Sequence, residues 1–242
     1  MARVAIVTGG SGGIGQASAL KLARDGMAVV VHYGGNRDVA DETVKAITED
    51  GGKAIAVQAD ITEPASVAAM FDQAEQEYGG VDVIVHTAGV MNQPTPLVDV
   101  DFDTLDRVHR INIRGTFAVA QQAARRVRDG GAIVFFSTSV LGLNLPGYTV
   151  YNATKGAAEA ITMILAKELR GRDVTVNTVA PGPTATKLFL DGKDEETISR
   201  LANQAPLERL GQPEDIAEAV AFLGGPARWV NGQVMRVNGG IA

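Results

Sequence analysis

The sequence predicts an α/β protein in which seven strands form one doubly wound parallel sheet with helices on both faces. Seven short runs rich in Val, Ile and Ala alternate with longer Ala-rich stretches along the 242 residues. The runs are apolar without strict polar alternation, as expected of parallel strands that are buried on both faces. Strands that alternate with helices imply right-handed βαβ units. We therefore expect a single-domain α/β fold.

The apolar runs define the predicted strands, which in chain order are Val4–Val7, Ala28–Tyr33, Ala54–Gln58, Val81–His86, Ala132–Ser137, Val174–Val179 and Gln233–Val237. Helices fit between them. The first helix should bury a face of small and apolar residues, namely Gly15, Ala19, Leu22 and Gly26. The next segment, Pro64–Tyr78, opens on a proline that suits a first helical turn, and Thr62 is its expected cap.

The second half of the chain contains one clear helix and one segment of weak periodicity. A similar buried stripe follows Tyr151 and consists of Thr154, Ala158, Ile161 and Leu165. Residues 183–204 lack a clear period and carry three acids at 194–196, so we predict a mobile substrate lid there. No change in composition suggests a linker, so the domain is expected to span residues 1–242.

Size and composition restrict the class of protein. The formal net charge is −6 and 45% of the residues are hydrophobic, which suits one well-buried core. The mild acidity argues against nucleic-acid or anionic-membrane binding. The chain has no cysteine, and its three histidines, His32, His86 and His109, lack metal-ligand spacing, so no metal is expected. Without a signal-peptide pattern or an apolar run of about 18 residues, a cytoplasmic protein is expected.

A glycine-rich loop follows the first strand and opens the first helix. Its spacing is Gly9-x3-Gly13-x-Gly15, preceded by Thr8. Glycines permit a tight turn and let the backbone approach a pyrophosphate, while the helix N-terminus offers oriented N–H groups. The strand–loop–helix context predicts a Rossmann-type dinucleotide site.

Tyr151 and Lys155 stand four residues apart in Tyr-Asn-Ala-Thr-Lys. A helix places such residues on one face, so a phenol lies beside an ammonium. A nearby cation favours the phenolate and lowers the pKa of a phenol, which makes it a better acid–base group. Most pairs at this spacing are surface contacts, and the catalytic interpretation depends on the other motifs.

Together the loop and the Tyr–Lys pair resemble the short-chain dehydrogenase/reductase family over nearly the whole chain. Further matches are Asp60 in Gln-Ala-Asp-Ile, Thr87-Ala-Gly89, Asn112 in Asn-Ile-Arg-Gly, Pro181-Gly182, Val230-Asn-Gly-Gln233 and Gly239-Gly240. His86-Thr87 replaces two asparagines of the family pattern, which weakens the usual side-chain brace, although a threonine hydroxyl substitutes in part. His86 itself is interpreted as structural or cofactor-adjacent.

The resemblance implies a catalytic set of Asn112, Ser139, Tyr151 and Lys155. Ser139 would orient a substrate carbonyl, and Ser137 is its alternative. Tyr151 would give the carbonyl oxygen a proton, and Lys155 would lower the Tyr151 pKa and hold the ribose. Asn112 would anchor a water, its alternative being a polar residue of a helix interior.

The cofactor is predicted from the loop, the resemblance and the end of the second strand. The predicted contacts, with Tyr151 and Lys155, are Thr8, Gly9, Ser11, Gly13, Ile14, Gly15, Tyr33, Asn36, Arg37, Asp60, Ile61, Ala88, Gly89, Pro181, Gly182, Thr184 and Thr186. No acid occupies residues 31–37, and Asn36 and Arg37 can donate to a 2′-phosphate. We predict a preference for NADPH over NADH; the alternative is that Arg37 is only an exposed first-turn residue.

The substrate is expected to be a small carbonyl compound, because the expected pocket residues are mostly apolar: Val140, Leu141, Asn144, Tyr148, Pro183, Leu188 and Phe189. This favours a ketone, an aldehyde or a 3-oxoacyl thioester, and the resemblance is strongest to the 3-oxoacyl-(acyl-carrier-protein) reductase-like branch. The resemblance also implies a homotetramer built by helices within 108–126 and 151–170.

Two further interpretations stay open at this point. Arg125, Arg126 and Arg128, with Arg172, form a basic cluster that is either a solvated helix end or a docking site for acyl carrier protein. The competing functions are an NAD(P)-dependent alcohol or sugar dehydrogenase and a non-catalytic dinucleotide-binding protein. The complete Asn112, Ser139, Tyr151 and Lys155 set favours an enzyme.

Overall fold

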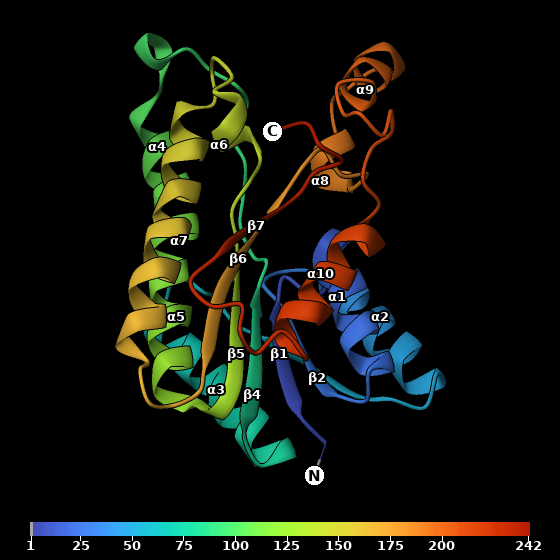
Figure 1. Cartoon of the computed structure of the whole chain (residues 1–242), viewed down its shortest axis with the longest axis vertical. Helices are drawn as coiled ribbons and strands as arrows, with labels where there is room; N and C mark the ends of the chain where they lie inside the picture. Colours follow the sequence, from blue (N-terminus) through green and yellow to red (C-terminus); the bar gives the residue numbers. More distant parts are fainter. Residues whose placement is uncertain (1) are drawn as a thin grey trace.

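The computed structural model describes residues 2–242 and contains the predicted seven-stranded parallel sheet in one domain. Its strands are β1 (Val4–Thr8), β2 (Ala28–Tyr33), β3 (Lys53–Gln58), β4 (Val81–His86), β5 (Val127–Phe136), β6 (Thr175–Pro181) and β7 (Val234–Val237). The strand order is β3-β2-β1-β4-β5-β6-β7, and every neighbouring pair is parallel. Figure 1 shows the sheet between two groups of helices.

The strand order reverses between β1 and β4, and this reversal determines where a ligand can bind. The chain first builds outward to β3 and then crosses back to place β4 on the other side of β1. In such sheets, ligands bind in the crevice beyond the carboxyl ends of the strands at the switch point. Thr8 pairs in register with His86 at that end of the two strands.

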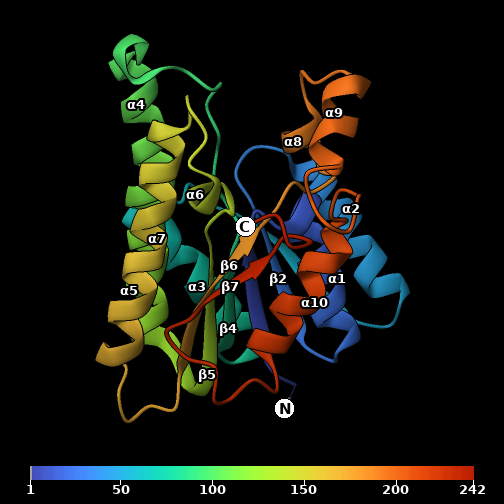
Figure 2. The ribbon, with the colours of Figure 1, turned by 45° about the horizontal axis from the view of Figure 1, so that its top comes forward.

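Two helical layers cover the sheet (Figures 1 and 2). One apolar cluster joins the sheet to α3 (Pro64–Tyr78), α5 (Gly115–Arg126) and α7 (Thr149–Glu168). The other joins it to α1 (Gly13–Arg24), α2 (Arg37–Glu49) and α10 (Pro213–Gly224). The remaining short elements are η1 (Leu97–Asp99), α4 (Phe102–His109), η2 (Arg110–Arg114), α6 (Val140–Leu143), α8 (Lys187–Leu190) and α9 (Glu195–Ala202).

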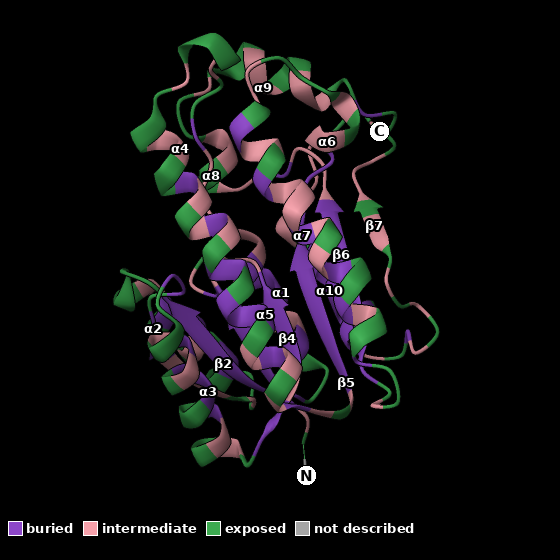
Figure 3. Cartoon of the chain, turned by 90° about the vertical axis from the view of Figure 1, so that its left-hand side faces the viewer, coloured by how far each residue is buried: buried purple, intermediate pink, exposed green. Residues whose placement is uncertain are grey.

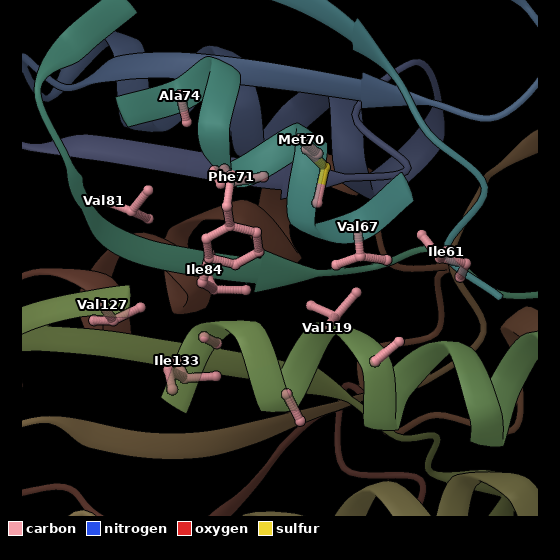
Figure 4. Close-up of a cluster of buried hydrophobic side chains, with 14 of the residues drawn as sticks. Ile61, Val67, Met70, Phe71, Ala74, Val81, Ile84, Val119, Val127 and Ile133 are labelled. Atoms are coloured by element: carbon pink, nitrogen blue, oxygen red, sulfur yellow. The ribbon is translucent and has the colours of Figure 1, made fainter. Parts of the chain in front are cut away.

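The core is built from the sheet and the inner faces of these helices. The central strands are buried along their length, whereas outward faces of the helices are exposed (Figure 3). Phe71 of α3 lies among Val67, Met70 and Ile84, with Val119 of α5 opposite (Figure 4). All five side chains are fully buried, so dispersion contacts and the hydrophobic effect hold α3 and α5 to the sheet.

Several sequence expectations need correction. Thr62 does not cap α3: Glu63 is the N-cap residue, and the Thr62 N–H instead donates to Asp60 Oδ1. Gly26 lies beyond the end of α1 with a φ of 88°, in the turn that leads to β2. Strand β5 begins at Val127 rather than Ala132, and a register shift in its pairing with β4 accommodates the extra residues.

The stretch after η1 is helical but not uniform. A π-turn, η2, separates α4 from α5, so the helix that contains Asn112 has one turn with a widened hydrogen-bond pattern. Such turns inside helices are frequent at functional sites. Residues 183–204, the expected lid, contain two short helices, α8 and α9, in this structure.

Candidate active site

The predicted cofactor loop lies at the carboxyl end of β1 and leads directly into α1. Gly9 and Gly13 have φ values of 68° and 51°, in the left-handed region that favours glycine. A Cβ on Gly15 would lie 2.1 Å from the Gly9 carbonyl oxygen, so only glycine allows α1 to start this close to β1. A Cβ on Gly12 would meet nothing within 4 Å, which leaves the backbone open to a ligand. The loop therefore fits a pyrophosphate at a helix N-terminus.

The neighbours of this loop hold its shape from β2 and β4. The Gly9 N–H donates to His32 Nδ1 at 3.1 Å, and the other His32 nitrogen contacts the Ala59 carbonyl at 3.0 Å. Burial lowers the pKa of His32, so the ring is neutral and Nε2 carries the proton. Sequence reasoning missed this role, although a polar residue at the end of a buried strand was a signal. The Thr87 hydroxyl donates to the Thr8 carbonyl, as the expected partial substitute for an asparagine.

Residues expected to bind the adenosine half of the cofactor lie at the ends of β2 and β3. Asn36 caps α2 by accepting from the Val39 N–H, and Arg37 in the first turn is exposed and paired with Asp41 at 3.3 Å. Asp60 is exposed after β3, and the hydrogen bond from the Thr62 N–H lowers its pKa. Asp60 is therefore a carboxylate at neutral pH, positioned at the crevice edge beside β2.

The other predicted cofactor residues divide between buried supports and the crevice edge. Tyr33 and Ile61 are buried, and Ile61 packs where a Cβ on Gly115 would lie. The Ala88 N–H donates to the Thr8 hydroxyl at 3.3 Å. Ile14 is partly buried against the core at the start of α1, and Ser11 lies in the loop.

The segment after β6 meets the glycine loop. Thr184 donates to the Gly182 carbonyl, and Thr186 caps α8 by accepting from the Phe189 N–H. A Cβ on Gly13 would lie 3.1 Å from the Thr186 methyl group, so the start of the expected lid touches the cofactor loop. Pro181 ends β6 beside Val237 of β7.

Tyr151 and Lys155 lie together on the first turns of α7. Lys155 Nζ is 5.6 Å from the Tyr151 ring centroid and donates to the Phe136 carbonyl at 3.1 Å. Burial raises the pKa of Tyr151 to about 12, with Tyr148 as a second cause, and burial lowers the pKa of Lys155 to about 8. Desolvation is the largest cause at both groups, and the lowering of the Tyr151 pKa by Lys155 stays a prediction.

Three hydroxyl residues follow β5, and their environments differ. Ser137 donates to Glu159 Oε1 at 2.6 Å. Ser139 is 1% exposed, donates its proton to the Ala180 carbonyl at 2.9 Å and accepts from Asn238 Nδ2 at 3.0 Å. Thr138, between them, accepts from the Val140 N–H at 3.3 Å, and its hydroxyl acts to lower the pKa of Tyr151.

In this structure the hydroxyls of both serines are engaged by other groups, and the role of Ser139 beside Tyr151 stays a prediction. The Ser139 hydroxyl donates its proton to the Ala180 carbonyl. The hydroxyl of the expected alternative, Ser137, donates its proton to the Glu159 carboxylate. Strand β5 ends at Phe136, so Thr138 and Ser139 are the second and third residues beyond it.

Asn112 lies in the π-turn and connects three elements. Its Oδ1 accepts from the Val90 N–H at 2.8 Å, and its Nδ2 donates to the Val90 carbonyl at 2.8 Å and to Thr154 Oγ1 at 3.1 Å. A Cβ on Gly89 would lie 3.1 Å from Asn112 Oδ1 and 3.7 Å from Lys155 Nζ. The glycine therefore leaves space where the amide and the ammonium converge. Buried, hydrogen-bonded polar groups of this kind hold a site rigid.

Three of the four arginines of the basic cluster expected as a docking site form ion pairs within the molecule, whereas Arg125 is exposed. Arg126 pairs with Glu75 and Asp72, Arg128 pairs with Asp82, and Arg172 pairs with Asp129. Arg172 also donates to the Ala124 and Val127 carbonyls. These residues lie around the start of β5, whereas the catalytic candidates follow its end. The arrangement supports a structural role and does not favour carrier-protein docking there.

The comparisons with known proteins agree with this geometry. A family model described as Enoyl-(Acyl carrier protein) reductase matches residues 9–242. A short-chain type dehydrogenase/reductase of Picea abies is 44% identical over 248 residues, which cover 98% of this chain and 92% of that protein. An NADPH-dependent aldehyde reductase-like protein, chloroplastic, of Arabidopsis thaliana is 39% identical over 252 residues, covering 98% and 93%.

Solved structures show the same fold. A short chain dehydrogenase from Burkholderia cenocepacia J2315, solved in complex with NADP, superposes with a TM-score of 0.90 at 35% identity, covering 99% of this chain and 97% of that chain. The loop, the Tyr–Lys pair and these matches lead to one conclusion. The chain belongs to the short-chain dehydrogenase/reductase family and is an NAD(P)H-dependent oxidoreductase.

Proposed function

We propose that the protein is an NADPH-dependent reductase of a ketone, an aldehyde or a 3-oxoacyl thioester, with Tyr151 as the general acid. The observation that carries this proposal is the partly buried Tyr151 side chain at the start of α7, with Lys155 Nζ 5.6 Å from its ring centroid. Relatives named as reductases, one of them NADPH-dependent, support the same reaction class.

The ionisation states of this site suit reduction. With a pKa of about 12, Tyr151 carries its proton at neutral pH and can donate it to a carbonyl oxygen. With a pKa of about 8, Lys155 is mostly protonated at pH 7, and its charge stabilises the phenolate that proton donation leaves. When bound, the nicotinamide supplies the hydride, and the protein supplies position and electrostatics.

We assign the hydroxyl that orients the carbonyl to Thr138. Its hydroxyl acts to lower the pKa of Tyr151, whereas the protons of both flanking serines are donated elsewhere. Thr138→Val removes the hydroxyl with little change in volume and should lower kcat/KM by about a hundredfold. Ser137→Ala is the matched control and should retain most activity. A loss confined to Ser139→Ala would restore Ser139 to this role.

The preference for NADPH rests on Arg37 and Asn36. No acid stands at the end of β2, and the Arg37 side chain is exposed and held only by a surface pair with Asp41. A guanidinium in such a pair can exchange its partner for a phosphate at little cost. Arg37→Ala should raise the KM for NADPH and leave the KM for NADH unchanged. An unchanged KM for NADPH would remove the phosphate role.

The reaction itself is tested by following NADPH oxidation in the presence of acetoacetyl thioesters, simple ketones and aldehydes. Turnover that disappears in Tyr151→Phe supports the reductase and its acid. Turnover only with alcohols or sugars plus NADP⁺ or NAD⁺ would favour the dehydrogenase alternative. NADPH binding without any turnover would favour the non-catalytic alternative.

We further propose that the chain forms a homotetramer and that residues 183–204 act as a mobile lid. Large apolar side chains are exposed on α5 and α7, namely Phe117, Met163 and Ile164, and others lie at Phe222 and Trp229. Trp229 is the one tryptophan of the sequence and is 99% exposed in the single chain. Burial in a tetramer would protect its fluorescence from iodide quenching, and light scattering would give the mass.

Within residues 2–242, no helix combines the length and apolarity that crossing a bilayer takes. Cytoplasmic location stays a prediction.

A further inference from the structure

His86 lies at the end of β4 and bonds to two hydroxyl groups on either side. Its Nδ1 is 2.8 Å from Thr8 Oγ1, at the start of the cofactor loop. Its Nε2 is 3.0 Å from Thr116 Oγ1, on α5. The ring is 3% exposed and packs edge-on against Phe135. A buried imidazole with a specific partner on each nitrogen is held in one orientation.

The direction of these hydrogen bonds follows from the number of protons available. The Thr116 hydroxyl donates its one proton to the Asn112 carbonyl at 2.6 Å, so toward His86 it can only accept. Nε2 must therefore carry the ring proton, which makes Nδ1 an acceptor. The Thr8 hydroxyl then donates to Nδ1, and its oxygen is free to accept from the Ala88 N–H.

The result is a one-way chain of donors that runs from the cofactor loop to the catalytic helix. It passes from Thr8 through His86 and Thr116 to the carbonyl of Asn112 in the π-turn. The Asn112 side chain continues the connection to Thr154, which directly precedes Lys155 on α7. Residues of β1, β4, α5, η2 and α7 are thus connected by hydrogen bonds that pass through the His86 imidazole.

We infer that His86 is a positioning residue that couples the cofactor loop to the catalytic amide. Through Nδ1 it holds Thr8, and through Nε2 and Thr116 it holds the Asn112 carbonyl. The inference rests on the proposed reductase activity. A simple brace at this position would need one hydrogen bond, whereas a coupling residue needs a donor and an acceptor in fixed places.

Two amide substitutions separate the halves of this role. His86→Asn keeps an acceptor near the position of Nδ1 but is too short to reach Thr116. His86→Gln places an amide donor near the position of Nε2 but removes the acceptor for Thr8. We expect His86→Asn to lower kcat about five- to tenfold with a nearly unchanged Kd for NADPH, and His86→Gln to raise that Kd about five- to tenfold with a nearly unchanged kcat.

Further variants distinguish coupling from a general loss of packing. Thr116→Val should reproduce the loss of kcat seen in His86→Asn, and the double variant should be no worse than either single one. Thr162→Val is the matched control, because Thr162 is a buried threonine on α7 that bonds to Ala158 and Thr178 away from the chain of donors. It should lower Tm without separating kcat from the Kd for NADPH.

A cofactor-free readout tests the tautomer directly. In ¹⁵N-histidine NMR, the three histidines are few enough to assign with the His86→Asn variant, and His86 should show a protonated Nε2 and a bare Nδ1. A protonated Nδ1 would overturn the inference, as would His86→Asn and His86→Gln losing kcat and NADPH affinity in parallel. If the wild-type protein bound NADPH but reduced no carbonyl compound, the proposed function would fail, and the tautomer and the two affinities would still decide the inference.

Discussion

Acid should destabilise the protein through His86, and the size of the effect can be worked out from the structure. Burial, with the Lys155 charge as a lesser cause, lowers the pKa of His86 from 6.5 to about 3. In the unfolded chain the imidazole binds a proton below about pH 6.5, whereas in the folded protein it stays neutral. Between these values the unfolded state holds more protons, so the free energy of unfolding falls as the pH falls. From pH 7 to pH 5 the loss from this one group is about 2 kcal/mol.

Urea denaturation at pH 7 and at pH 5, at one protein concentration, measures this loss. His86→Asn is the comparison, because an amide does not titrate in this range. Carboxylates and His32 titrate in both proteins, so the wild-type protein should lose about 2 kcal/mol more than the variant between the two pH values. Equal losses would show that His86 is protonated as easily in the folded protein as in the unfolded chain, and the inference of a buried neutral donor–acceptor would be refuted.

Three further substitutions test the packing of the site and the core. Gly89→Ala inserts a methyl group between the Asn112 amide and the Lys155 ammonium. The kcat of NADPH oxidation should therefore fall about tenfold or more, while Tm changes little. An unchanged kcat would mean that the reaction does not need this space. Gly15→Ala would collide with a backbone oxygen of the cofactor loop, so NADPH affinity measured by titration calorimetry should drop, and retained affinity would contradict the loop geometry. Phe71→Ala empties the centre of a fully buried cluster and should cost about 3–5 kcal/mol in urea denaturation, with a loss below about 1 kcal/mol as the contrary result.

Local patterns were enough to predict most of the fold. Apolar runs of strand length, separated by helices, gave all seven strands to within a few residues at most ends, because burial on both faces demands continuous apolar sequence. The boundaries of β5 were missed, since Asp129 and Gly130 do not look like strand residues and enter β5 through a register shift that depends on β4. The π-turn was also missed, because one widened turn leaves no mark on a helical period.

At the candidate site, the sequence predicts which residues come together, whereas the tertiary structure determines the partners and the ionisation of each one. Glycine spacing and the i, i+4 spacing of Tyr151 and Lys155 are local properties, so the sequence by itself determined the cofactor loop and the phenol–ammonium pair. How the hydroxyls after β5 are engaged depends on the partners that Ala180 and Glu159 offer from other elements. Tertiary structure also decided the directions of the two pKa shifts, because desolvation comes from the whole fold and is the largest cause at both Tyr151 and Lys155. The role of His86 was likewise decided there, since its two hydrogen-bond partners lie 78 and 30 residues away in the chain.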